Sequence, residues 1–263
     1  MKKTQRLNLV EISACGYKNA NKKLNFTGGD RNARIQLLIQ ELLRKDKWDL
    51  ISVRNFPYNA LLKIQEDMEN RGFKLYIHEK FHNEPGKWRY SCLQVLFVRE
   101  GLEFKQEYRI DKGEVEEFET IYRYICGVIK FAGNDIHFKT SHFPCASSWS
   151  ATQVKRKIDM LEDEIRYQQL RMNELAISAG NYNTDLDGDF VGKDQFAKLK
   201  WLDIVSQPTY TDEKNKEMKK LDHCFISKPL QDSGAIQVTI EVLDHHYSVL
   251  TDHKIISIKL QKY

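Results

Sequence analysis

The sequence predicts an α/β fold in which two β-sheets pack face to face and helices cover their outer faces. In the first third of the chain, two amphipathic helices alternate with short apolar strands; a block of strands, a long helix and a strand-rich end follow. This order of elements is typical of layered α/β proteins. The 263 residues contain no internal repeat or linker, so we expect a single domain over residues 1–263.

Hydrophobic periodicity defines the elements of the first third. The apolar run Leu7–Ser13 predicts a strand. Apolar residues then recur at helical spacing, at Ile35, Leu38, Ile39, Leu42 and Leu43. They predict a helix that covers a sheet, with Asp30 as its N-cap. A strand over Asp49–Val53 and a second helix over Ala60–Asn70, which ends at Gly72, complete this part.

Strands dominate the rest of the chain. Five are expected between glycine-containing turns, over Phe73–His78, Ser91–Arg99, Glu103–Ile110, Tyr122–Phe131 and Asn134–Thr140. The segment SSWSATQVKRKIDMLEDEIRYQQLRMNEL predicts a long helix that leads into the strand Leu175–Ala179. The charged segment TDEKNKEMKK predicts a solvated loop. Three last strands are expected over Leu221–Ser227, Ile236–Leu243 and Ile255–Gln261.

The composition is that of a globular protein with a substantial core. Apolar residues make up 41% and charged residues 30%, and the net charge of +4 permits contact with phosphates without demonstrating it. No stretch approaches the ~20 consecutive apolar residues of a membrane span, and the first apolar run is too short for a signal peptide. The five scattered cysteines lack a CxxC pair, which argues against disulfides and structural zinc. We therefore expect a cytoplasmic protein.

Polar residues of the kinds used in catalysis fall at the ends of several expected strands. His142, in SHFP, follows one strand, and Asn181 and Asn183, in GNYN, follow another. Asp222 begins a later strand, and residues 251–253, TDH, precede the last one. Each residue alone fits an ordinary turn or a satisfied polar group. Only the joint pattern indicates a site.

In order and spacing, these motifs resemble the endonuclease/exonuclease/phosphatase superfamily over nearly the whole chain. WDLISVRN is similar to the family segment that ends in Gln-Glu, TSHFP to a Thr-His-Leu motif, and SAGNYN to Gly-Asp-Phe-Asn. KKLDHCFIS is similar to Leu-Asp-Tyr-Ile-Phe, and LTDHKII to Ser-Asp-His. The resemblance implies the fold of pancreatic-type deoxyribonucleases, a four-layer sandwich of two mixed β-sheets. It also implies a cleft between the sheets that handles a phosphate ester.

The resemblance implies roles for five residues. His142 and His253 would contact the scissile phosphate, and Asp222 would hold His253 in one tautomer. Asn183 would donate a hydrogen bond to a phosphate oxygen. Arg54, at the position of the family's glutamine, would add positive charge.

Three positions depart from the family pattern. Asn181 stands where an aspartate orients or deprotonates the attacking water, and an amide cannot accept that proton at neutral pH. Asn55 stands for the glutamate that binds the divalent cation, and Ser13 for an asparagine on the first strand. Mg²⁺ prefers anionic oxygen ligands. Since the resemblance gives Asp222 the role of holding His253, it leaves Asp252 as the one inherited metal carboxylate.

Two other carboxylates could replace a lost metal ligand. Glu11 has the same strand parity as Ser13, and Asp185 lies two residues past Asn183. No motif of the family supports either residue in that role.

Three hypotheses about function remain open. The chain binds a phosphate-containing ligand, nucleic acid being one candidate, with hydrolysis impaired or absent and no cofactor. Alternatively, it is an active Mg²⁺- or Mn²⁺-dependent phosphodiesterase or phosphatase with a rearranged metal site, or its function lies on another surface. Losing a general base removes a factor of ~10²–10⁴ in rate, which favours the first hypothesis. Aromatic residues that could stack on bases or belong to the core are Trp88, Tyr90, Trp149 and Tyr182.

Overall fold

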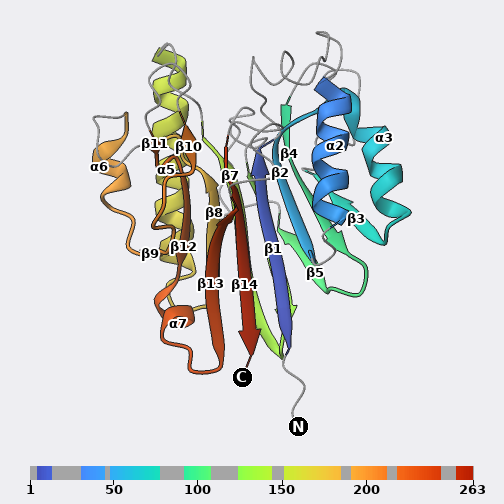
Figure 1. Cartoon of the computed structure of the whole chain (residues 1–263). Coiled ribbons are helices and arrows are strands. Elements are labelled where there is room, and N and C mark those ends of the chain that lie inside the picture. The colour runs from blue at the N-terminus through green and yellow to red at the C-terminus, as the bar shows by residue number, and fades with distance from the viewer. Residues whose placement is uncertain are drawn as a thin grey trace.

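Two six-stranded mixed β-sheets pack face to face in the computed structural model, which describes residues 5–13, 31–44, 48–77, 92–107, 124–143, 151–184, 191–211, 218–243 and 253–262 (Figure 1). The first sheet has the order β13 (Ile236–Leu243), β14 (Ile255–Lys262), β1 (Arg6–Ser13), β2 (Leu50–Pro57), β4 (Cys92–Arg99) and β3 (Phe73–Tyr76). The second has the order β5 (Phe104–Glu107), β6 (Tyr124–Phe131), β7 (Asn134–His142), β8 (Ala176–Asn181), β12 (Asp222–Ile226) and β9 (Leu202–Asp203). Each sheet contains one parallel pair, β1 with β2 and β7 with β8.

Helices cover the outer faces and complete the predicted four layers (Figure 1). Helices α2 (Arg31–Arg44) and α3 (Tyr58–Glu69) bury apolar side chains against β1, β2 and β4 of the first sheet. Helix α5 (Ala151–Leu170) packs on the second sheet, where Leu161 and Tyr167 join a core with Phe225. None of the described helices has the length and apolar character needed to cross a membrane. The fold class predicted from the order of elements is confirmed.

Strand alternation places a second core between the sheets. On β1, Leu7 and Leu9 face the second sheet, whereas Val10 and Ile12 face the helices. On β7 and β8, Phe138, Ile177 and Ala179 face the first sheet and join the same core. Because alternate residues of a strand point to opposite faces, β1 contributes apolar side chains both to this core and to the core beneath the helices.

The sequence did not predict the shortest elements. Strands β10 (Tyr210–Thr211) and β11 (Met218–Lys219) pair at the two ends of the charged segment, so the prediction of a loop there is wrong at its ends. Helices α6 (Lys193–Phe196) and α7 (Lys228–Gln231), like β9, were also missed. Elements of two to four residues are too short to show a hydrophobic period.

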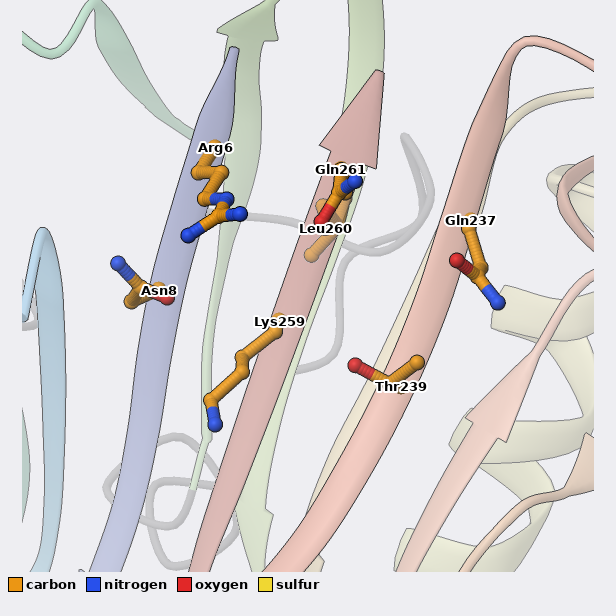
Figure 2. Close-up of a pocket in the computed structure, with 7 residues that line it drawn as sticks. All are labelled: Arg6, Asn8, Gln237, Thr239, Lys259, Leu260 and Gln261. Carbon is orange, nitrogen blue, oxygen red and sulfur yellow. The ribbon is translucent and has the colours of Figure 1, made fainter. Parts of the chain in front are cut away.

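The outer face of the first sheet is polar where β1, β14 and β13 run side by side. A shallow hollow there is lined by Arg6, Asn8, Gln237, Thr239, Lys259, Leu260 and Gln261 (Figure 2). Lys259 forms an ion pair with Glu241 on β13, 2.8 Å long. Polar residues alternate here with buried Leu7, Leu9 and Ile258, which is the pattern of a sheet with one solvated face.

Gly180 determines how closely β7 and β8 approach. It has φ 143°, and a Cβ atom at this position would collide with the backbone carbonyl oxygen of Ser141, its register partner on β7. Only glycine combines this backbone conformation with so close an approach. The requirement explains a glycine inside a buried strand, directly before Asn181.

We expect Gly180→Ala to lower the free energy of unfolding by roughly 3 kcal/mol, because the strands must separate to admit the methyl group. Urea denaturation followed by circular dichroism would measure it. Gly234→Ala is the matched control, since a methyl group at that position would meet no neighbouring atom within 4 Å; it should change stability by less than about 0.5 kcal/mol. Equal effects of the two substitutions would contradict the packing argument.

Candidate functional site

At one end of the sandwich, the facing sides of the two sheets change from apolar to polar. On the first sheet, the inner positions change from Leu7 and Leu9 to Glu11 and Ser13 on β1, and from Leu50 to Ser52 and Arg54 on β2. The second sheet shows the same change at the corresponding ends of its strands, to Thr140 and His142 on β7, Asn181 on β8 and Asp222 on β12. These strand ends lie away from the two chain termini (Figure 1). Strand register alone therefore gathers the polar residues.

An ion pair between Arg54 and Asp222 joins the two sheets at this end. The guanidinium Nη2 contacts Asp222 Oδ1, and both side chains are 0% exposed. The second carboxylate oxygen, Oδ2, lies 2.8 Å from Nδ1 of His253. Burial by itself raises the pKa of the Asp222 carboxyl, but the charge of Arg54, followed by contacts with His253, lowers it to about 2. Asp222 is therefore a carboxylate at neutral pH.

The contacts of His253 fix its tautomer when the ring is neutral. Since the Asp222 carboxylate can only accept, Nδ1 carries the hydrogen and Nε2 is an acceptor. The amide Nδ2 of Asn181 lies 3.4 Å from Nε2, the arrangement expected for an amide that donates a hydrogen bond to it. An aspartate at position 181 could not make this donation. The asparagine therefore suits a neutral imidazole.

Asn181 and Asn183 form a turn that ends β8. The side-chain oxygen of Asn181 accepts a 2.7 Å hydrogen bond from the backbone N–H of Asn183, which has the left-handed φ of 49°. Asparagine tolerates this conformation better than most residues. The Asn183 amide donates one hydrogen to the carbonyl of Phe143, 2.7 Å away, and Lys157 on α5 donates to the Asn183 carbonyl at 2.8 Å. The turn is thus held from three sides.

A second contact across the sheets joins Asn55 and His142. The amide Nδ2 of Asn55 lies 3.2 Å from Nε2 of His142, and both side chains are partly exposed. Asn55 has φ 56° and lies at a register shift between β2 and β4, between Val53 and Phe56. This bulge turns the residue out of the regular alternation. The bulge thus brings Asn55, which stands where the resemblance expects a glutamate, beside His142, a predicted phosphate-binding residue.

Below these residues lies a buried polar layer centred on Glu11. Ser52 Oγ and Thr140 Oγ1 are 2.7 Å apart across the sheets, and the amide of Gln94 donates to both, at 2.8 and 3.0 Å. Glu11 is 0% exposed, and the hydroxyls of Thr140 and Ser52 are its polar neighbours. Burial raises its pKa from 4.5 to about 7, although the charge of Arg54 opposes the rise. Glu11 is costly to ionise.

The structure brings together most of the residues selected from the sequence. His142, Asn183 and Asn55 lie at the partly exposed rim, Asn181 and His253 lie just beneath it, and Asp222, Ser13 and Glu11 are fully buried. Asp252 and Asp185 lie outside the described residues, as do Trp88, Tyr90 and Trp149. Their predicted roles stay predictions.

One candidate for stacking on bases is wrong. The Tyr182 ring is 0% exposed, stacks on Phe143 with ring centroids 4.4 Å apart, and has its hydroxyl 3.0 Å from Ser178 Oγ. Ser52, Gln94 and Thr140 were not predicted as site residues. The signal for them was present, because each is a polar residue at an inward position of a predicted strand.

Comparisons with solved structures identify the architecture. A Bacteroides thetaiotaomicron protein described as an endonuclease/exonuclease/phosphatase family protein matches with a TM-score of 0.63 and 13% identity, covering 99% of each chain. The chain has the endonuclease/exonuclease/phosphatase fold. D. rerio TDP2 complexed with a single-strand DNA product matches at 0.62 and 11%, over 97% of this chain and 98% of that one. A mannosyl-6-phosphatase from Bacteroides thetaiotaomicron matches at 0.61 and 14%, over 97% and 99%. No family model and no curated protein matches the sequence.

The described residues do not fit the divalent cation that this fold family implies. Ser13 and Asn55, at two positions where the resemblance places polar or acidic site residues, are neutral. Glu11 and Asp222 have carboxyl groups, but the positive charge that most favours ionisation of both is that of Arg54. Among the described residues, no group of three or more His, Cys, Asp or Glu side chains is placed to hold a metal ion.

The raised pKa of Glu11 predicts how stability changes with pH. The folded state keeps the proton up to pH of about 7 and the unfolded state loses it near 4.5, so the free energy of unfolding falls as pH rises between these values. The fall amounts to about 3 kcal/mol. Glu11→Gln should abolish this component, as measured by urea denaturation at pH 5 and pH 8.

Glu66→Gln, at an exposed position of α3, is the control and should keep the wild-type pH dependence. If Glu11→Gln retained it as well, Glu11 would be ionised throughout this range, against the account of its burial.

Proposed function

We propose that this protein binds a phosphate ester at the rim formed by His142, Asn183 and Asn55, above His253, and that efficient hydrolysis has been lost. The observation that carries the proposal is the convergence of His142, Asn183 and His253 at one end of the sandwich, with His142 and Asn183 as the donors to phosphate. Two histidines from distant parts of the chain lie next to Asn55 and Asn181, and Asn183 has a second amide hydrogen beyond the one given to Phe143. Imidazole and amide N–H groups are ordinary donors to phosphate oxygens.

The loss of hydrolysis follows from the residue at position 181. Its side-chain oxygen accepts the Asn183 N–H and its nitrogen faces His253. Both ends of the amide are therefore engaged within the protein, and neither can take a proton from water at neutral pH. A bound ester would be held without the base that activates a nucleophile.

Fold neighbours support phosphate esters as the ligand class. One of the matching structures holds a single-strand DNA product and another is a mannosyl-6-phosphatase. DNA and a mannosyl 6-phosphate both contain a phosphate group bonded to a sugar. We take nucleic acid as the first candidate, because the chain has a net charge of +4 and neutralisation of phosphates by cationic residues drives such binding.

His142→Ala should weaken binding of a 5′-phosphorylated, 3′-fluorescein-labelled DNA oligonucleotide by about tenfold, the cost of one hydrogen bond to a charged group. Fluorescence anisotropy would give the Kd, with mannose 6-phosphate as the small competitor. His137→Ala is the matched control, because His137 lies five residues earlier on the same strand and pairs with Glu174 at 2.7 Å.

Absence of binding of both probes to the wild-type protein would contradict the proposal. Equal losses in His142→Ala and His137→Ala would exclude the rim as the binding site. Competition by mannose 6-phosphate with little dependence on salt would identify a small phosphomonoester as the ligand, whereas affinity that falls steeply with salt would identify nucleic acid.

A further inference from the structure

The guanidinium of Arg54 lies between the two sheets and supplies positive charge to the buried carboxyl groups of Glu11 and Asp222. Arg54 belongs to β2, next to Asn55, and its register partner on β1 is Ser13. Its side chain points between the sheets, is 0% exposed, and reaches Asp222 on the opposite sheet. Its charge is therefore part of the protein interior and does not depend on a dissolved ion.

The two buried carboxylates of the site both respond to this charge. Arg54 is the strongest electrostatic influence that favours ionisation of Asp222, and also of Glu11. Its Nε and Nη1 have no acceptor among the described residues. One cation thus serves two carboxylates from the two sheets. A second cation placed among the same groups would be repelled by the guanidinium and would find Asp222 already neutralised.

We propose that Arg54 is the resident cation of this site and that the protein engages its phosphate ester without a divalent metal ion. The inference rests on the proposed function for the identity of the ligand, but the role of Arg54 can be tested without ligand. A hard divalent cation needs anionic oxygens as ligands. Among the described residues, Ser13, Asn55 and Asn181 supply none, the Asp222 carboxylate is paired with Arg54, and a cation at Glu11 would meet the charge of the same guanidinium.

Replacing the cation is the direct test. Arg54→Gln introduces the neutral residue that the family has at this position and leaves Glu11 and Asp222 facing each other without a counter-charge. We expect about 5 mM Mn²⁺ to raise the Tm of this variant by at least ~3 °C, because a cation that binds only the folded state stabilises it. The wild-type protein should shift by less than ~1 °C under the same conditions.

Arg99→Gln is the matched control, because Arg99 also lies in the first sheet and faces a carboxylate, with 4.0 Å between its Nε and Asp49 Oδ1, but is far more exposed. It should respond to Mn²⁺ no more than the wild type does. A wild-type shift as large as that of Arg54→Gln, or an Arg54→Gln shift no larger than that of Arg99→Gln, would overturn the role of Arg54. Should Arg54→Gln not fold, the wild-type titration with Mn²⁺ and Mg²⁺ still decides, since saturable binding would refute the proposal.

Binding of the labelled oligonucleotide in EDTA and in Mg²⁺ tests metal independence separately from the proposed phosphate binding. The Kd of the labelled oligonucleotide should differ by less than about twofold between EDTA and Mg²⁺ at equal ionic strength. A gain above about tenfold on adding Mg²⁺ would overturn metal independence and leave the phosphate site standing. No binding in either buffer would overturn the proposed function, while the Tm measurements would still report on Arg54.

Discussion

The ion pair between Arg54 and Asp222 links the two sheets at the end where the functional residues gather. It fixes Asp222, which in turn holds Nδ1 of His253 at 2.8 Å and so directs Nε2 of that ring toward Asn181. The pair is fully buried, and removal of one partner would leave an uncompensated charge in the interior, at a cost of about 3–5 kcal/mol. Every contact of His253 described above depends on it.

The ion pair also explains why the polar layer can exist inside a sandwich core. Glu11, Ser52, Gln94 and Thr140 interrupt an apolar interior that runs without a break through the other half of the molecule. Buried polar groups are tolerated when they satisfy one another. Here the hydroxyls of Ser52 and Thr140 and the amide nitrogen of Gln94 do so across the sheets, whereas Glu11 in its ionised form depends mainly on the charge of Arg54. The site is thus costly to maintain, which is typical of regions kept for function.

Much of the fold could be predicted from the sequence because long elements show clear hydrophobic periods. The strand Ile236–Leu243 was predicted with its observed bounds, and the helix around Leu38 and Leu42 packs as expected. The strand that ends at Asn181 was predicted too short, since Gly180 breaks the apolar run while the backbone continues its pairing with β7. That pairing depends on a close approach to Ser141, which no local pattern reveals.

For the site, the sequence supplied the residues but not their connections. The resemblance singled out His142, Asn183, Asp222 and His253 and drew attention to Arg54 as a departure. It could not show that Arg54 crosses to the other sheet, because side-chain partners between strands far apart in the chain depend on how the sheets are packed. Nor could the pattern distinguish Tyr182, a core aromatic, from a residue that stacks on a base. Both are tertiary properties.

The central claim is that Arg54 and Asp222 act as one unit, and a double-mutant cycle measures this directly. The cycle would compare the free energies of unfolding of the wild type, Arg54→Met, Asp222→Asn and the double variant. We predict a coupling of at least about 2 kcal/mol, with the double variant more stable than the sum of the single losses implies. Additive losses, with a coupling below about 0.5 kcal/mol, would contradict the account.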